Sequence, residues 1–259
     1  MVLSDTLLEE GLSYAEQNFC SDTETHLRFD KNLIKENFDL TGKKILDFGC
    51  GMGSMLLWYR KNWDCTATGI DIDRHHIKVC EELIKKFNFN DIRLKLIDLS
   101  KESIDESFDF ISMNDVIEHL PIRDIPVILK KLETMLTPGG TLFISYPPWE
   151  GPYASHVDHA IGFPWGQYLP ERLLLKLIQK NNLNMVGELE SNLEEAYLGL
   201  NKINHKKLMQ ILETHTNLIV KKRKSHSIIN RIPLLRNLNV TMPPFHFLIT
   251  KEFLFLQKD

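Results

Sequence analysis

The stretch that decides the fold is Ile45-Leu46-Asp47-Phe48-Gly49-Cys50-Gly51-Met52-Gly53-Ser54. It opens with the apolar run of a buried strand and then places glycine at three alternate positions. Glycine allows positive φ angles and lets a ligand approach the backbone closely. Such glycines also occur in dehydrogenases, kinases and ordinary turns, and no lysine follows them as in a P-loop. The stretch therefore predicts a strand, a ligand-binding loop and a helix.

Three acidic residues narrow the class of ligand. Asp47 comes two residues before the first glycine, where a carboxylate would repel a pyrophosphate but suits the ammonium of an amino acid. The next predicted strand ends at Asp71, whose carboxylate can accept hydrogen bonds from ribose hydroxyls. The third ends near Asp98, which can accept from an adenine amino group. These positions favour a nucleoside that carries an amino acid.

Strand and helix patterns alternate through the middle of the chain. Apolar segments predict strands at 44–48, 66–72, 92–97, 108–113 and 141–146. Helical stripes between them contain Ile77, Cys80, Ile84 and Phe87, and then Ile125, Leu129, Leu132 and Leu136, closed by Pro138-Gly139-Gly140. This alternation predicts a mostly parallel sheet, with its ligand beyond the carboxyl ends of the strands.

The flanking regions complete the predicted architecture. Residues 1–40 read as helical, with a break around Ser21 to Thr25, and late strands at 219–222 and 245–256 bring the sheet to seven. Helices are predicted at 171–180 and 206–218. We expect an α/β, Rossmann-like, doubly wound, mostly parallel sheet in one domain. Its predicted parts are a helical cap (1–40), a cofactor-binding core (41–147), a lid inserted after strand five (148–200) and a C-terminal completion of the sheet (201–259).

The fourth predicted strand continues as Asn114-Asp115-Val116-Ile117-Glu118-His119, and the core closes with Leu136-Thr137-Pro138-Gly139-Gly140-Thr141. With these motifs, residues 41–147 resemble the class I S-adenosylmethionine-dependent methyltransferases, in the group that includes the ubiquinone-biosynthesis-type O-methyltransferases. The resemblance implies S-adenosylmethionine as the methyl donor and S-adenosylhomocysteine as the product.

The resemblance also implies which residues bind the cofactor. Asp47, Gly49 and Gly51 would line the methionine end, Asp71 would hold the ribose, and Asp98 and Leu99 would frame the adenine. Asn114 would face the methionine or the sulfonium, and the set also includes Cys50 and Ile72.

The acceptor side is predicted in the segment after the fifth strand. Transfer to an oxygen requires removal of a proton, so a histidine or carboxylate is expected there. His156, Asp158 and His159 could form a base and its orienting carboxylate. They could also bind a divalent ion, although one short spacing supports this only weakly and we predict no metal. A third interpretation is a polar loop whose histidines cap turns or face solvent.

The most specific function that the sequence favours is O-methylation of a small molecule, such as a sugar or other hydroxyl compound. This segment, together with 199–203 and 231–236, weakly resembles methyltransferases of surface-glycan or secondary-metabolite pathways. The alternatives are N- or C-methylation of another small molecule, RNA or protein, and non-catalytic binding of S-adenosylmethionine. Asn114-Asp115-Val116-Ile117 stands where amino-directed nucleic-acid enzymes carry an Asn-Pro-Pro-Tyr type of motif, which lowers that alternative.

Charge and composition give weaker indications. The net charge is −4, but residues 201–240 carry nine basic side chains and one acid. The densest run, Lys221-Lys222-Arg223-Lys224, could attract a phosphorylated acceptor such as a nucleotide sugar, or could be the solvated edge of a strand. It is thin as a nucleic-acid footprint. Four cysteines without metal-ligand spacing, no signal-peptide pattern and no membrane-length apolar run favour a cytoplasmic protein. The sequence does not indicate an oligomeric state.

Overall fold

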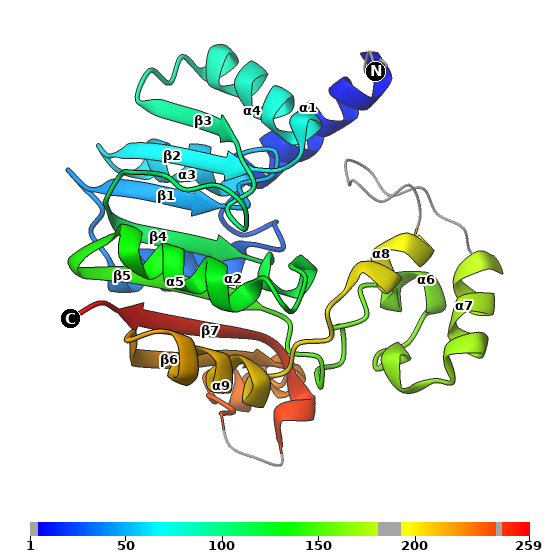
Figure 1. The fold of residues 1–259 in the computed structure, drawn as a ribbon. Helices are drawn as coiled ribbons and strands as arrows, with labels where there is room; N and C mark the ends of the chain where they lie inside the picture. The colour runs from blue at the N-terminus through cyan, green and yellow to red at the C-terminus, as the bar shows by residue number, and fades with distance from the viewer. Residues whose placement is uncertain (1–4, 181–192, 242–244) are drawn as a thin grey trace.

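The computed structural model describes residues 5–180, 193–241 and 245–259. Within them, seven strands form one sheet in the order β3-β2-β1-β4-β5-β7-β6 (Figure 1). Strands β1 to β5 are parallel, and β7 is antiparallel to both β5 and β6. The strands are β1 Lys44–Phe48, β2 Thr66–Asp71, β3 Ile92–Leu96, β4 Phe108–Asn114, β5 Leu136–Tyr146, β6 Ile219–Ser227 and β7 Ile249–Gln257.

Helices cover both faces of this sheet, as expected for a doubly wound fold. Helices α5 and α9 lie on the face nearer the viewer in Figure 1, and α2 and α3 lie on the other. No helix in the described part of the chain is long and apolar enough to cross a membrane. The α-helices are α1 Asp5–Cys20, α2 Arg28–Asn37, α3 Ser54–Asn62, α4 Arg74–Phe87, α5 Ile125–Met135, α6 Asp158–Ile161, α7 Glu171–Lys180, α8 Leu193–Gly199 and α9 His205–His215. The 3-10 helices are η1 Ile117–His119, η2 Gly166–Tyr168, η3 Ile228–Arg231, η4 Pro233–Leu235 and η5 Phe245–Leu248.

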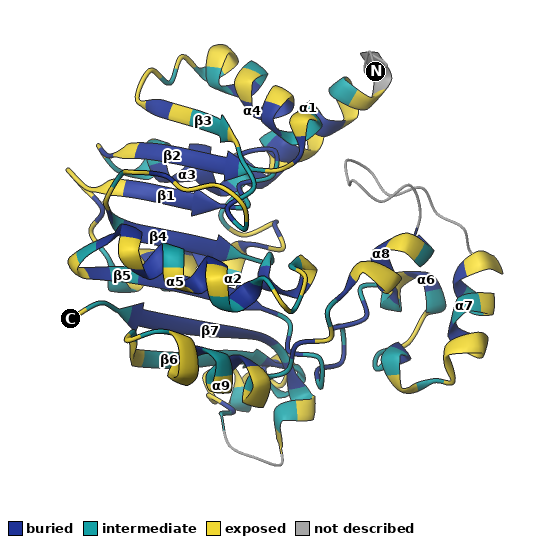
Figure 2. Cartoon of the chain, in the orientation of Figure 1, coloured by how far each residue is buried: buried dark blue, intermediate teal, exposed yellow. Residues whose placement is uncertain are grey.

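The central strands are buried on both faces (Figure 2). Successive side chains of a strand point to opposite faces, so each strand supplies two cores. On β1, Leu46 belongs to the cluster under α5 and α9, whereas Ile45 belongs to the cluster under α2 and α3. This burial explains why the strands read as nearly continuous apolar runs.

The segment after β5 forms a separate group of helices, α6 to α8. Val157, Leu174 and Tyr197 are among the buried side chains of its own small core. It lies on the side toward which the arrowheads of β1 to β5 point (Figure 1). The predicted fold class, with a seven-stranded, mostly parallel sheet and an insertion after strand five, is confirmed.

One predicted helix boundary was wrong. The stripe that was expected to include Leu136 ends at Met135, and Leu136 instead begins β5 opposite Phe108. The register then jumps, because Phe110 pairs with Thr141. The predicted terminator, Pro138-Gly139-Gly140, is therefore a bulge within β5, where Gly139 has a φ of +74°.

The C-terminal boundaries also differ from the prediction. Residues 245–248 form the 3-10 helix η5 and not the start of a strand, since pairing between β6 and β7 ends at Ile249. Strand β6 runs to Ser227, beyond its predicted end at 222. Helix α9 ends at His215 instead of 218, because Thr216 has an extended backbone.

Candidate functional site

The order of the strands places the topological switch point of the sheet at the carboxyl ends of β1 and β4. The chain moves to one side of β1 through β2 and to the other side through β4, and ligands of doubly wound sheets bind at such a switch point. The loops after these strands are close together: a Cβ on Gly49 would lie 2.6 Å from Cγ2 of Val116. Glycine at this position therefore lets the two loops meet.

The glycine loop packs against the protein at Gly53 and leaves space beside its backbone at Gly51. Gly53, with a φ of +88°, is closed, because a Cβ there would lie 2.3 Å from the sulfur of Cys80. Gly51 has a φ of +51°, and a Cβ there would meet nothing within 4 Å. The neighbouring thiol of Cys50 is buried, and burial raises its pKa well above the usual value. A ligand can therefore approach the backbone at Gly51, whereas the Cys50 side chain points into the protein.

Asp71 links this loop to the end of β2. Its Oδ2 accepts the N–H of Gly51 at 2.8 Å, and its Oδ1 accepts the N–H of Asp73, also at 2.8 Å. Burial alone would raise the pKa of Asp71, but the contact with His76 and the backbone N–H groups hold it below the usual value. Next to it, Ile72 keeps 64% of its surface exposed. An ionised acceptor and an open apolar side chain thus lie together where the sequence predicted the ribose.

The predicted adenine residues follow β3. Asp98 accepts from the hydroxyl of Ser100 at 2.6 Å and lies 2.7 Å from Nζ of Lys101. These two contacts, led by Lys101, lower its pKa. The side chain of Leu99 is 2% exposed and belongs to the core, so only its backbone can face a ligand.

Asp47 is an incompletely satisfied buried carboxylate. Its Oδ1 accepts the hydroxyl of Ser112 at 2.8 Å, but its Oδ2 is buried and accepts no hydrogen bond from the described residues. Burial raises its pKa to about 7, opposed in part by the Ser112 hydrogen bond. A bound cation would stabilise the ionised form, which fits the ammonium predicted for this position.

Asn114 belongs to a polar network at the end of β4. Its Nδ2 donates to Asp30 of α2 at 2.9 Å and to Ser145 of β5 at 3.2 Å. Its Oδ1 is buried and has no hydrogen-bond partner in the part of the chain that the structure describes. Lys251 of β7 donates to Asp30 at 2.7 Å and to Asp115 at 2.6 Å. Asp115 has a φ of +52°, and 28% of its side chain is exposed. The network fixes the turn after β4 from three other elements. The sequence did not indicate Asp30 or Lys251.

The structure brings His156 next to residues other than its expected partners. Nε2 of His156 lies 3.9 Å from Oε1 of Glu118, and its ring centroid lies 5.3 Å from that of His119. Burial, and secondly the proximity of His119, lower the pKa of His156 to about 4. Among the described residues, Asp158 makes no side-chain hydrogen bond or ion pair with His156 or His159. Both Asp158 and His159 lie on α6, where His159 is exposed.

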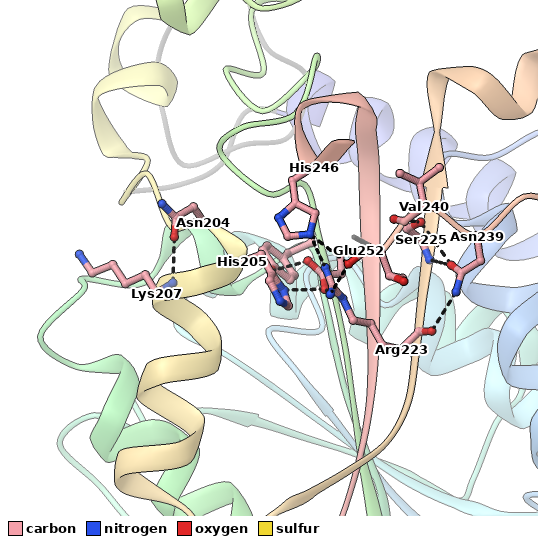
Figure 3. Close-up of polar contacts among 11 residues, drawn as sticks. Asn204, His205, Lys207, Arg223, Ser225, Asn239, Val240, His246 and Glu252 are labelled. Atoms are coloured by element: carbon pink, nitrogen blue, oxygen red, sulfur yellow. Dashed lines mark hydrogen bonds and ion pairs between the residues drawn. The ribbon is translucent and has the colours of Figure 1, made fainter. Parts of the chain in front are cut away.

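A second buried network, shown in Figure 3, lies at the C-terminal part of the sheet. Oε1 of Glu252 accepts from Nε of Arg223 at 2.5 Å and lies 2.8 Å from Nδ1 of His205. Its Oε2 accepts the hydroxyl of Tyr146 at 2.9 Å. These contacts lower the pKa of Glu252 despite its burial. Both oxygens of the Glu252 carboxylate have partners within the protein. The network therefore joins β5, β6, β7 and α9 and leaves neither oxygen for a ligand.

The basic run at 221–224 lies on β6, the edge strand next to β7. Arg223 of this run is bound to Glu252, and Lys222 donates to Oδ1 of Asn37 at 2.5 Å. This placement supports the interpretation of the run as a protected strand edge.

A family model described as a methyltransferase domain matches residues 21–188. The chain belongs to this methyltransferase family. The match confirms the prediction of a class I S-adenosylmethionine-dependent methyltransferase, with S-adenosylmethionine as the methyl donor of the family.

Curated relatives of this methyltransferase differ in the atom that they methylate. Over 115 residues it is 31% identical to a ubiquinone biosynthesis O-methyltransferase of Pseudomonas fluorescens, covering 44% of this chain and 48% of the relative. Over 106 residues it is 27% identical to a (S)-tetrahydroprotoberberine N-methyltransferase of Eschscholzia californica, covering 40% and 30%. The matched part thus spans less than half the length of these relatives, and their acceptors do not identify the acceptor of this chain.

Solved structures show the same fold over nearly the whole methyltransferase. A cyclopropane synthase from Mycobacterium tuberculosis aligns with a TM-score of 0.65 at 14% identity, covering 99% of this chain and 95% of the other. A magnesium protoporphyrin IX methyltransferase from Synechocystis PCC 6803, solved with bound S-adenosylmethionine, aligns with a TM-score of 0.54 at 11% identity, covering 100% and 87%.

The residues of this methyltransferase fit S-adenosylmethionine. The backbone is open at Gly51, and Asp71 is ionised beside it. Two buried oxygens, Oδ2 of Asp47 and Oδ1 of Asn114, have no hydrogen-bond partner among residues 5–180, 193–241 and 245–259 and can accept from a ligand.

Proposed function

We propose that this protein transfers the methyl group of S-adenosylmethionine to an oxygen of a small-molecule acceptor. The observation that supports the oxygen acceptor is the position of His156 and Glu118 at the same edge of the sheet as the glycine loop. Transfer to oxygen needs a group that handles the acceptor's proton. The O-methyltransferases among the curated relatives agree with this choice.

The cofactor would be held by the residues at the ends of β1 to β4. Asp71 would accept from the ribose hydroxyls, with Ile72 against the apolar face of the nucleoside, and Asp98 would accept from the adenine. Asp47 and Asn114 would face the methionine end with their unpartnered oxygens. S-adenosylmethionine supplies an activated methyl group, so the protein's task is alignment, with the acceptor oxygen about 3–3.5 Å from the methyl carbon.

The acceptor would lie between the core and the lid of residues 148–200. His156 is uncharged near neutral pH, because its pKa is lowered to about 4, so an imidazole nitrogen keeps a lone pair for a proton or another ligand. Asp158 and His159 follow on α6 and are further candidates on this side. The lid would exclude water from the reacting atoms.

The experiment measures release of S-adenosylhomocysteine with pools of hydroxyl compounds and, separately, with amines. We expect turnover with a hydroxyl pool. The matched variants are His156→Ala and the exposed-residue control His215→Ala. The first should lower turnover at least 10-fold and leave S-adenosylhomocysteine binding within 3-fold. Turnover only with amines, or full activity of His156→Ala, would contradict the proposal.

A further inference from the structure

We propose that Glu118, His119 and His156 bind a divalent transition-metal ion, and that this ion holds and activates the acceptor oxygen. The metal site stands on the geometry of these three side chains. The activating role rests on the proposed function.

The spacing of the three side chains is close to that of a metal site. One ligand atom from each lies within 4.8 Å of the other two. Nε2 of His156 and Oε1 of Glu118 are 3.9 Å apart. Zinc–ligand bonds of about 2.0–2.1 Å at tetrahedral angles place neighbouring ligand atoms about 3.4 Å apart. A separation of 4.8 Å would have to shorten by about 1.4 Å to reach this spacing, and side-chain rotations of the two ligands can share that change.

The carboxylate of Glu118 is buried and, within the described part of the chain, has no hydrogen-bond donor. Its side chain is only 5% exposed, and both of its oxygens are buried without a hydrogen-bond partner. Buried carboxylates in folded proteins are normally paired or bound to a metal.

The three metal ligands come from two loops, and hydrogen bonds hold one of these loops in place. Glu118 and His119 are adjacent in η1, and Asn201 holds this turn, since its Nδ2 donates to the carbonyls of Ile117 at 2.6 Å and Leu120 at 2.8 Å. The backbone N–H of Asn201 also donates to the carbonyl of Glu118 at 2.9 Å. His156 comes from the loop after β5 and has a φ of +57°, an unusual conformation that often accompanies functional sites.

The ligand set indicates both the kind of metal and the use of the site. Two imidazoles and one carboxylate suit zinc and other first-row transition metals better than magnesium or calcium. Three protein ligands leave positions open, as in catalytic sites. His119 is exposed, so the site can be reached from solvent. A hydroxyl bound there would lose its proton more readily, and an acceptor with a second oxygen next to the hydroxyl could bind through both.

The binding test uses Zn²⁺ and the full-length protein after treatment with a chelator and dialysis. Competition with a chromophoric chelator should show one tightly bound ion. His119→Gln and His156→Gln should each weaken binding at least 10-fold. Glu118→Gln should do the same and should also raise the melting temperature of the metal-free protein, because it removes the buried, unpartnered carboxylate. If Glu118→Gln stabilises the protein and also abolishes metal binding, the loss of binding comes from the missing ligand and not from a damaged fold.

Two histidine controls decide the location of the site. His159→Gln changes the next histidine of the same loop, and His215→Gln changes an exposed histidine at the end of α9. Both should bind Zn²⁺ as the unmodified protein does. Equal loss in His159→Gln would place the ion in the His156/Asp158/His159 set instead. Binding that none of the three ligand substitutions weakens would overturn the site. His119 is exposed, so His119→Gln tests the site even if a buried variant fails to fold.

Activity and cofactor binding separate the two parts of the proposal. With an accepted hydroxyl compound, removal of the metal should lower turnover at least 100-fold while S-adenosylhomocysteine still raises the melting temperature. Unchanged turnover without metal would overturn the activating role and leave the methyltransferase proposal intact. Metal bound at the three residues, with turnover of amines only, would instead contradict the O-methyltransferase proposal.

Discussion

Nζ of Lys251, on the last strand, donates to Oδ2 of Asp30, on the second helix, at 2.7 Å. The same ammonium donates to Asp115 in the turn after β4 at 2.6 Å. Asp30 is fully buried and Lys251 is 9% exposed. One buried cation therefore pairs with two carboxylates and joins helix α2 and strand β7 to the turn after β4. Burial would lower the pKa of Lys251, but Asp115 and Asp30 raise it, so the ammonium remains charged.

Replacing this cation should destabilise the protein strongly. Lys251→Met leaves Asp30 buried without its cationic partner, and removal of one member of a buried ion pair costs about 3–5 kcal/mol. Unfolding by urea should show this loss. The double variant Asp30→Asn/Lys251→Met should recover part of it. A single variant as stable as the unmodified protein would show that the pair is unimportant for the fold.

Two glycines of the loop should respond differently to the same substitution. Gly51→Ala meets open space, so it should cost only the 1–2 kcal/mol of a positive φ, yet the added methyl should weaken S-adenosylhomocysteine binding at least 10-fold. Gly53→Ala would clash with Cys80 and should cost more stability, about 2–4 kcal/mol. Calorimetric binding and thermal melting check both. Equal binding by Gly51→Ala would mean that the cofactor does not approach the loop at this residue.

Local pattern was sufficient to predict the sheet and the cofactor side of the site. Strand β1, the glycines and Asp71 follow one another within 30 residues, and period and turn chemistry are local properties. The boundaries that failed, at Leu136 and residues 245–248, depend on where a partner strand begins or ends. A single sequence does not show that pairing.

The acceptor side was predicted less well, because its partners are distant in sequence. His156 was placed with Asp158 and His159 on proximity along the chain, but the fold brings Glu118 and His119 to it. The adjacent Glu118-His119 pair at the end of a strand was the available signal. Nothing in the sequence linked Asp30 to Lys251, which lie 221 residues apart.

Loss of the charge on Asp71 should weaken binding of the cofactor. Asp71→Asn keeps one acceptor oxygen for the loop but loses the ionised pair of oxygens, and hydrogen bonds to charged groups contribute about 1.5–3 kcal/mol. Binding of S-adenosylhomocysteine should fall about 10- to 100-fold in calorimetric titration. Asp64→Asn, at a side chain that is 95% exposed, is the matched control and should bind normally. Weakening by both variants to the same extent would remove the ribose assignment.

Asp47 should make the stability of the cofactor-free protein depend on pH. Its pKa is about 7 in the folded protein and near 3.8 when unfolded, so the folded state binds more protons in between. The contribution of Asp47 to stability is therefore greatest below pH 4 and is lost as the pH rises from about 4 through 7. Asp47→Asn removes this dependence, so from pH 4 to pH 8 it should gain up to about 4 kcal/mol relative to the unmodified protein. Urea unfolding at several pH values measures the difference. Saturating S-adenosylmethionine, whose ammonium would stabilise the ionised carboxylate, should reduce the difference in stability between Asp47→Asn and the unmodified protein. Parallel pH profiles for the two proteins would show that Asp47 is ionised without a ligand and would remove the reason for placing the ammonium beside it.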